Sequence, residues 1–300
     1  MANIHLTSAW PYHTILRGID NVIFNKFEER NPIGRTLFNV RDSSQYQEDT
    51  ITVGGIGTMV QKTEGSALTY ASMSEGFRKT FTHLDYGAAF RITRELLRDE
   101  MYGTMEKLGI ELSNSATATE ETLLSNHFNR AFATYTGPDG IVLCATNHVR
   151  EDGGTYSNTL STAADLSQTS LEQALIDFSD FRTGGGRRVS IEPKTLLVPK
   201  ELRFEAYRLT KSERTAENDT NAANPLKGLL DVTVWNYLTD TDAWFVLADK
   251  DQHGMVMYER EAFWTDYEYE FETKDYKISG MFAQSSGWED ARGVYGTAGA

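Results

Sequence analysis

The chain has 300 residues, of which 40% are hydrophobic and 24% are charged, and its formal net charge is −14 at pH 7. This composition is typical of a globular protein with a hydrophobic core. The negative charge argues against the basic surface by which most nucleic-acid-binding proteins hold phosphates. The single cysteine, Cys144, excludes an intrachain disulfide framework. No apolar run is long enough to span a bilayer, and the N-terminus shows no signal-peptide pattern, so we expect a soluble protein of the cytoplasm.

The N-terminal region carries an amphipathic pattern between residues 13 and 31. Apolar side chains recur there at helical spacing, at Ile15, Ile19, Val22, Ile23 and Phe27. Pro32 and Gly34 then break the pattern. The spacing predicts a short helix that docks either on its own domain or on another molecule, and both alternatives remain open from the pattern alone.

Residues 49–91 are rich in Thr, Gly and Ser, with single apolar residues between turn signals such as GG, EGS and SEG. This pattern predicts a long β-hairpin that projects from the body of the protein. Because an isolated hairpin is at best marginally stable in water, it must lean on a surface of this chain or of another.

A long helical pattern follows, from Thr93 as the expected N-cap to Phe132. Its apolar positions are Leu96, Leu97, Met101, Met105, Leu108, Leu112, Leu123, Leu124, Phe128 and Phe132. If Gly103 and Gly109 do not break it, the helix is about 60 Å long and acts as a strut.

The loop at residues 135–140 marks a candidate domain boundary, and helices and strands alternate beyond it. We expect helices at 171–181 and 199–211, a polar solvent loop at 212–225, and strands at 189–199, 229–234, 243–248 and 255–259. The fold class predicted is therefore α+β.

The segment 264–273 reads WTDYEYEFET and alternates with the period of a strand. The acidic residues are Asp266, Glu268, Glu270 and Glu272, and the aromatic ones are Tyr267, Tyr269 and Phe271. Neighbouring carboxylates on such a face can share a cation, but no histidine lies nearby. We therefore interpret the acidic side as a face in water or against a basic partner surface.

Two segments imitate ligand-binding motifs. Asp249, Asp251 and Gly254 match the start of a calcium loop, but its last position is Arg260 and strand-like segments flank it, so we interpret it as a turn between strands. The Gly-rich run 182–188 has charge for a phosphate but lacks the P-loop frame, and a flexible turn explains it better. The six histidines are scattered, and we find no catalytic constellation, so we expect no enzymatic activity, no cofactor and no metal.

Three segments in this order resemble one protein family: GIVLCATNHVREDGGTYSN at 140–158, PKTLLVPKELRFE at 193–205, and NYLTDTDAWFVLADKDQHG at 236–254, followed by GWEDARGVYGTAG at 287–299. They are similar to the major capsid proteins of tailed double-stranded DNA bacteriophages, in particular the Mu-like head-subunit branch. The resemblance implies the Hong Kong 97-like (Johnson) capsid fold. Its parts correspond here to an N-terminal arm at 1–48, an extended hairpin loop at 49–92, a peripheral domain at 93–136 and 255–300, and an axial domain at 137–254.

The resemblance also implies a function and partners. The chain is expected to self-assemble into hexamers and pentamers of an icosahedral head that encloses double-stranded DNA, with scaffold, portal and decoration proteins as further partners. No segment before the arm is long enough to be a cleavable scaffold, so we expect a separate one. The alternative is the shell protein of an encapsulin-type nanocompartment.

Subunit-interface candidates follow from the arm, the hairpin and the axial loop. They are Ile15, Ile19, Ile23, Phe27, Lys62, Glu64, Arg78, Lys79, Arg214, Glu217 and Asp219. Lys62 and Lys79 lie where some family members form a covalent crosslink, but no motif identifies a pair here. The charge predicts an acidic inner wall that repels DNA, with Arg182, Arg187 and Arg188 as the alternative basic patch.

Overall fold

The computed structural model describes the chain apart from residues 1–31, 69, 71–74, 96–101 and 215–222. The predicted arm helix lies outside the described residues, and so do six of the interface candidates: Ile15, Ile19, Ile23, Phe27, Glu217 and Asp219.

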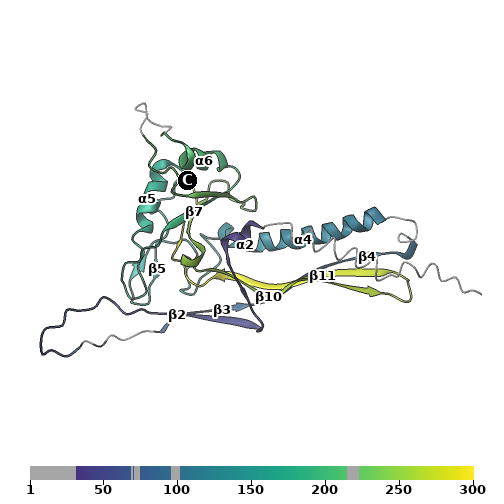
Figure 1. The fold of residues 1–300 in the computed structure, drawn as a ribbon, viewed down its shortest axis with the longest axis horizontal. Coiled ribbons are helices and arrows are strands. Elements are labelled where there is room, and N and C mark those ends of the chain that lie inside the picture. The colour runs from purple at the N-terminus through teal and green to yellow at the C-terminus, as the bar shows by residue number, and fades with distance from the viewer. Residues whose placement is uncertain (1–31, 69, 71–74, 96–101, 215–222) are drawn as a thin grey trace, which may run out of the picture.

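An elongated four-stranded sheet forms the long arm of the molecule (Figure 1). Its strand order is β1 (Asn39–Asp42), β10 (Met255–Tyr269), β11 (Tyr276–Trp288) and β4 (Leu84–Ile92). β1 runs parallel to β10, and the other pairs are antiparallel. The strands predicted at 255–259 and 264–273 are therefore one long strand, which ends at Tyr269.

The helix α4 (Tyr102–Asn129) lies along one face of this sheet. Leu112 and Ala116 pack against Phe263, Ile278 and Phe282, which buries the apolar stripe of the helix. The strut was predicted for residues 93–132; the structure describes 28 of these residues as one helix of about 42 Å, and residues 96–101 lie outside the described residues. It ends at Asn129 because the chain turns back there, and Cys144 then donates a backbone hydrogen bond to the carbonyl of Ala131.

A two-stranded hairpin projects from the end of the sheet that lies opposite the turn between β10 and β11 (Figure 1). β2 (Gln47–Val53) pairs antiparallel with β3 (Glu75–Thr82). The pairing ends at Thr82, ten residues before the expected end at residue 92, because β4 leaves the hairpin and pairs with β11. The hairpin therefore joins β1 and β4, the two outer strands of the long sheet.

A second body contains a four-stranded sheet in the order β12 (Val294–Thr297), β9 (Trp244–Ala248), β7 (Pro193–Val198) and β8 (Asp231–Val234). The helices α5 (Gln168–Phe178) and α6 (Arg203–Lys211) pack on one of its faces. We call this body the axial body. β12 comes from the segment that was expected in the peripheral domain, but it pairs with β9 and so belongs to the axial sheet.

The strand β9 explains why this region reads as a continuous apolar run. Trp244, Val246 and Ala248 face α5 and α6, whereas Phe245 and Leu247 face the core that surrounds the end of α4. A strand covered on both faces has no polar side, so its sequence does not alternate. α6 begins at Arg203 rather than at Pro199 because residues 200–202 form a turn.

A buried polar junction connects the two bodies beside α2 (Ile33–Leu37). The carboxylate of Glu121 on α4 accepts hydrogen bonds from the Gly34 backbone at 3.0 Å and from the indole of Trp235. Burial raises the pKa of Glu121, and these two donors oppose the rise. A Cβ at Gly34 would lie 2.5 Å from the Cδ1 methyl of the buried Leu124, so a larger residue there requires Leu124 to shift. The junction therefore fixes α2, α4 and the axial body against one another.

Three short elements remain. They are the strands β5 (His148–Val149) and β6 (Thr155–Tyr156) and the 3-10 turn η2 (Lys250–Gln252).

We predict that the subunit loses stability in mild acid because His127 and His253 are buried. Burial lowers the pKa of each to about 4, against an ordinary value near 6.5. Between pH 6.5 and 4 these histidines are therefore protonated in the unfolded chain but neutral in the folded chain. The free energy of unfolding falls as pH falls through this window. Urea titrations at pH 7 and pH 5 should show a loss of about 2 kcal/mol for each histidine.

The variant His127→Gln is the control for this prediction. It should show a smaller difference in unfolding free energy between the two pH values than the wild type. Equal differences for the two proteins would contradict the assignment to His127.

Candidate assembly surfaces

The tip of the β2–β3 hairpin carries large apolar side chains that are mostly exposed. Met59 is 98% exposed, Tyr70 95% and Val60 75%. Ile51, Val53, Ile56 and Leu68 on the same hairpin are also exposed. Apolar groups gathered on a projection of this kind mark an interaction surface. Lys62 and Glu64 lie exposed between them.

The root of the hairpin is held firmly to the body. Thr50 donates a hydrogen bond to Glu289 at 3.2 Å, and the same carboxylate accepts from Tyr258 at 2.7 Å. The ammonium of Lys79 donates to the carbonyl of Thr136 at 2.6 Å, and burial lowers its pKa. Arg78 pairs with Asp49 on the opposite hairpin strand. The structure therefore places Arg78 and Lys79 at the root, away from the tip.

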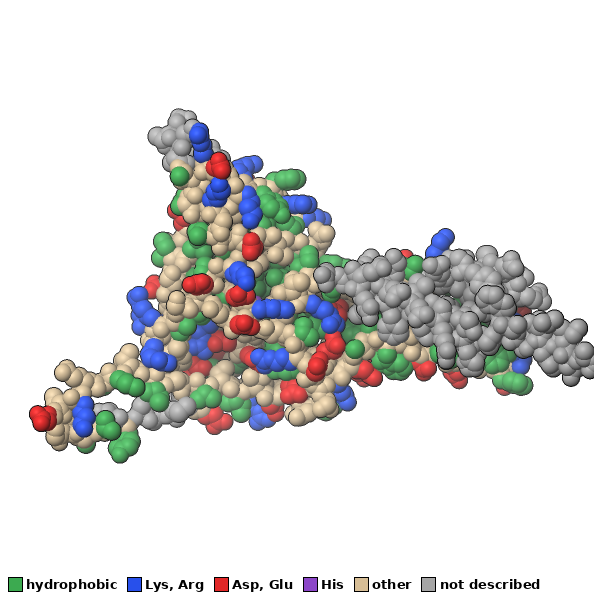
Figure 2. Space-filling view, viewed as in Figure 1, with side chains coloured by type: hydrophobic (Ala, Val, Ile, Leu, Met, Phe, Trp, Pro, Cys, Tyr) green, Lys and Arg blue, Asp and Glu red, His purple; other side chains and the backbone are tan. Residues whose placement is uncertain are grey.

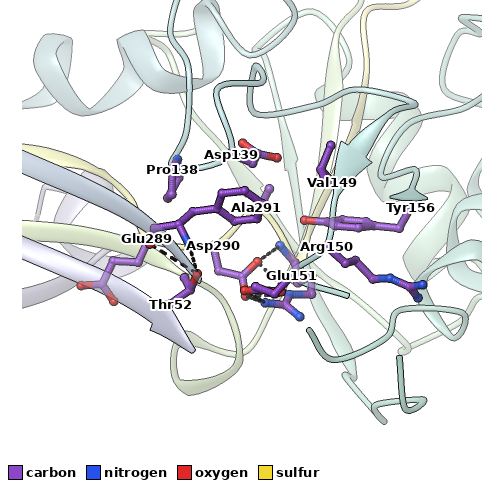
Figure 3. A pocket seen from close by; sticks show the side chains of 12 residues that line it. Thr52, Pro138, Asp139, Val149, Arg150, Glu151, Tyr156, Glu289, Asp290 and Ala291 are labelled. Atoms are coloured by element: carbon purple, nitrogen blue, oxygen red, sulfur yellow. Dashed lines mark hydrogen bonds and ion pairs between the residues drawn. The ribbon is translucent and has the colours of Figure 1, made fainter. Parts of the chain in front are cut away.

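A small cavity of about 20 Å³ lies where the root meets the axial body (Figure 3). Thr52 and Phe77 of the hairpin line one side of it. The other side carries an ion-pair cluster in which Arg292 meets Asp290 at 2.6 Å and Glu151 at 3.8 Å. A space of this size holds one water molecule, so it is a packing gap and not a substrate site.

The Gly-rich run 182–188 is the second place where the hairpin touches the axial body. A Cβ at Gly185 would lie 2.2 Å from the carbonyl oxygen of Gly55 and 3.0 Å from the carbonyl carbon of Ile56. The backbone of the hairpin crosses that of the axial loop here, and only glycine at position 185 permits this approach. The hairpin thus crosses the axial loop at Gly185, and this close approach explains the glycine there without a bound phosphate.

Two of its arginines have partners within the same loop region. Arg188 lies 3.4 Å from Asp180, and Arg182 donates to the carbonyl of Gly186 at 3.3 Å.

The calcium-like turn at 249–254 is held by ordinary side-chain contacts. Asp249 pairs with Lys194 at 2.7 Å and accepts from the backbone of Lys250 at 2.8 Å. Its hydrogen bond with Lys194 lowers the pKa of the carboxyl. His253 accepts a hydrogen bond from the backbone of Met255 and is buried. In the described ranges no cluster of three or more His, Cys, Asp or Glu side chains could hold a metal ion.

The far end of the long sheet carries the acidic strand face. Asp266, Glu268 and Glu272 are exposed, and Glu270 pairs with Lys277 at 2.8 Å. At the turn Phe271 is 77% exposed, and the ammonium of Lys274 lies 3.5 Å from its ring centroid. The remaining interface candidate, Arg214, lies exposed on the axial body in an isolated bridge with Ala223, far from the hairpin along the chain.

The sequence analysis missed Glu289, which accepts a hydrogen bond from the hairpin root, and the ion pair of Asp290 with Arg292, which lines the cavity beside it. They lie in the segment 287–299 that carries the family resemblance, and this was the only signal for them. Arg41 and Glu151, which pair with Glu289 and Arg292, lie far away in the sequence, so local patterns could not reveal these contacts.

The family model described as phage capsid protein matches residues 78–297, which is most of the chain. The chain belongs to the phage capsid protein family. No curated protein matches its sequence. The prediction of a phage major capsid protein is confirmed, and the family match favours it over the encapsulin-type alternative.

Solved structures from phages share the fold. The match to the capsid structure of the cyanophage P-SCSP1u has a TM-score of 0.62 at 11% identity and covers 90% of this chain and 89% of the cyanophage chain. The match to the mature capsid of bacteriophage PhiM1 has a TM-score of 0.62 at 11% identity and covers 89% of this chain and 86% of the PhiM1 chain. The match to the structure from Microbacterium phage Oxtober96 has a TM-score of 0.57 at 10% identity and covers 90% of this chain and 92% of the Oxtober96 chain. The predicted α+β Hong Kong 97-like fold is thus confirmed.

In this capsid protein, no helix among the described residues has the length and apolar character that crossing a membrane requires. Its membership in the phage capsid family assigns it to the virion.

We predict that alanine displaces the hairpin when it replaces Gly185 but not when it replaces Gly55, its neighbour across the crossing. Gly185→Ala places Cβ against the backbone of Gly55 and should push the hairpin away from the axial body. Gly55→Ala is the matched control, because its Cβ would lie 3.9 Å from Gly185, an ordinary contact. Limited proteolysis should cut the hairpin of Gly185→Ala faster than that of the control and the wild type. Equal cleavage of the two variants would contradict the crossing.

Proposed function

We propose that this capsid protein assembles into hexamers and pentamers of an icosahedral head and that the hairpin tip is an element of the contact between subunits. One observation carries the proposal: the tip exposes apolar side chains on a hairpin whose root is fixed to its own subunit. Burying one large apolar side chain contributes roughly 1.5–3 kcal/mol. A neighbouring copy that covers Met59, Val60 and Tyr70 therefore gains several kcal/mol.

The rooted hairpin makes this contact efficient. Because the strands of the root are already paired and bonded to the body, only the tip between them loses backbone freedom when it meets a neighbour. The exposed Lys62 and Glu64 then provide polar contacts at the rim. The role is structural, and the capsid family supports a non-enzymatic protein.

We also propose the partners that the sequence suggested. The arm segment 13–31 docks on a neighbouring subunit or a scaffold through Ile15, Ile19, Ile23 and Phe27. Assembly takes place in the host bacterial cytoplasm, with a scaffold, a portal and, in some capsids, decoration proteins. Glu217 and Asp219 with Arg214 form polar contacts around the axial loop. Double-stranded DNA is enclosed without sequence-specific binding.

The first test removes the hairpin tip. A variant in which residues 57–73 are replaced by Asn-Gly keeps β2, β3 and the root contacts. It should remain a folded, soluble subunit with an unfolding transition close to that of the wild type, and it should form no shells in negative-stain microscopy. Normal shells from this variant would contradict the role of the tip. Loss of folding would place the tip in the core of the subunit.

The second test concerns DNA. With a net charge of −14, the subunit should repel the duplex over most of its surface. In mobility-shift titrations at low salt, unassembled subunits should not bind duplex DNA at submicromolar concentration, because tight binding requires many phosphate contacts. Saturable submicromolar binding that Arg187→Glu with Arg188→Glu weakens would show that a local basic patch prevails.

A further inference from the structure

Two short connections join the hairpin to the long sheet. Residues 43–46 lead from β1 into β2, and His83 alone leads from β3 into β4. Because β1 and β4 are the outer strands of the sheet, we call these connections the two hinge points of the hairpin. Each contains a buried polar side chain: Ser43 is 8% exposed and His83 is 5% exposed.

The imidazole of His83 links both hinge points to the long sheet. Its Nε2 lies 3.1 Å from the Oγ of Ser43 at the other hinge point. Its Nδ1 lies 3.0 Å from the Oγ of Ser285 in β11, an inner strand of the sheet. Ser43 is also held to β10, because its backbone N–H donates to the carbonyl of Glu259 at 2.9 Å. One ring therefore connects the two hinge points with each other and with β11.

The chemistry of the partners assigns the donors and acceptors in this network. The hydroxyl of Ser43 donates its single hydrogen to the carboxylate of Glu48 at 2.6 Å, since an ionised carboxylate only accepts. The Oγ of Ser43 therefore accepts from His83, whose Nε2 carries the proton of the neutral ring. The Nδ1 is then bare and accepts from the hydroxyl of Ser285. This neutral tautomer satisfies both ring nitrogens.

A charged imidazolium fits the same place less well. Both of its nitrogens donate, so the hydroxyl of Ser285 would lose its acceptor. Two charged groups act on the ring in opposite directions: Glu48 of β2 favours the charge, and Arg260 of β10 opposes it. The ring of Tyr258, also in β10, lies 6.4 Å away. Burial is the largest cause, and it lowers the pKa of His83 below the ordinary value of about 6.5.

We propose that His83 is a proton-sensitive latch that fixes the angle between the hairpin and the long sheet. The neutral ring holds both hinge points against β11. A proton favours a state in which the ring has left this place, because the charge is hydrated there. The latched state is therefore favoured at neutral pH, and it loses stability relative to the released state as pH falls below about 6.5.

Release of the latch widens the range of hairpin angles without freeing the hairpin. The contacts of Thr50 with Glu289 and of Lys79 with Thr136 still hold the root. In the space-filling view the outer end of the hairpin stands clear of the axial body, so a small change of angle at the hinge points moves this end the furthest (Figure 2). The latch belongs to the single subunit, whereas any effect of it on shells rests on the proposed contact of the tip.

Spin labels test the latch in the unassembled subunit. Cysteines replace Ile51 on β2 and Asp266 on β10, which are both exposed. Cys144 stays unlabelled, because it is buried and burial raises the pKa of its thiol. Double electron–electron resonance then gives the distribution of distances between the two labels. It should be narrow at pH 7.5 and broader at pH 5.5 in the wild-type background, and His83→Ala should make it broad at both pH values.

His83→Gln is the matched control. Its amide can donate to Ser43 and accept from Ser285, but it takes up no proton in this range. The distribution should therefore stay narrow at both pH values, although His127 and His253 are still present. Ser285→Ala removes the donor to Nδ1 and so destabilises the neutral ring, and the broadening should then begin at a higher pH than in the wild type.

Three results would overturn the latch. They are an unchanged wild-type distribution between pH 7.5 and 5.5, equal broadening in the wild type and His83→Gln, and a His83→Ala distribution that matches the wild type at both pH values. Near-ultraviolet circular dichroism checks that each variant is folded, and the wild type with His83→Gln decides the question if His83→Ala is not. None of these results bears on the proposed contact between subunits, which the shells of the tip variant decide.

Discussion

The antiparallel pairing of β10 with β11 is the interaction on which the rest of the structure depends. It runs from the pair Met255↔Trp288, in the core beside the end of α4, to the pair Tyr269↔Tyr276 at the far turn. One end of this ladder lies in the core shared with α4 and the axial body, and the other end carries the exposed acidic turn. Every element of the long arm is attached to it: β1 and β4 along its edges, and α4 across its face. A thin, extended subunit is the result.

This thinness explains how the projecting parts are supported. The hairpin begins at β1 and returns to β4, so its two strands are anchored on opposite edges of the same sheet. The hydrogen bond from Thr50 to Glu289 and the contact of Lys79 with Thr136 add fixed points at the root. The glycine crossing at Gly185 adds another on the axial body. A subunit built in this way holds the proposed contact surface of the hairpin in place before assembly, with its apolar groups exposed.

The sequence predicted those elements whose patterns are local. α4 shows helical spacing and β9 a full apolar run, and both are present. β10 was predicted as two strands because register shifts between Glu259 and Trp264 interrupt the alternation of its side chains. β12 and β4 were assigned to other parts of the fold because strand partners far along the chain leave no periodic trace. The Gly55–Gly185 crossing and the Arg292 cluster depend on contacts between distant segments, and single-sequence patterns do not contain them.

Amide hydrogen exchange, compared between unassembled subunits and purified shells, tests the central claim most directly. The account predicts that the paired root, Gln47–Val53 with residues 75–82, is protected in both states, since its hydrogen bonds belong to the subunit. The tip at residues 54–68 should exchange rapidly in the free subunit and become protected only in shells. A tip equally protected in both states, or one that remains unprotected in intact shells, would contradict the claim that the hairpin is a preformed contact between subunits.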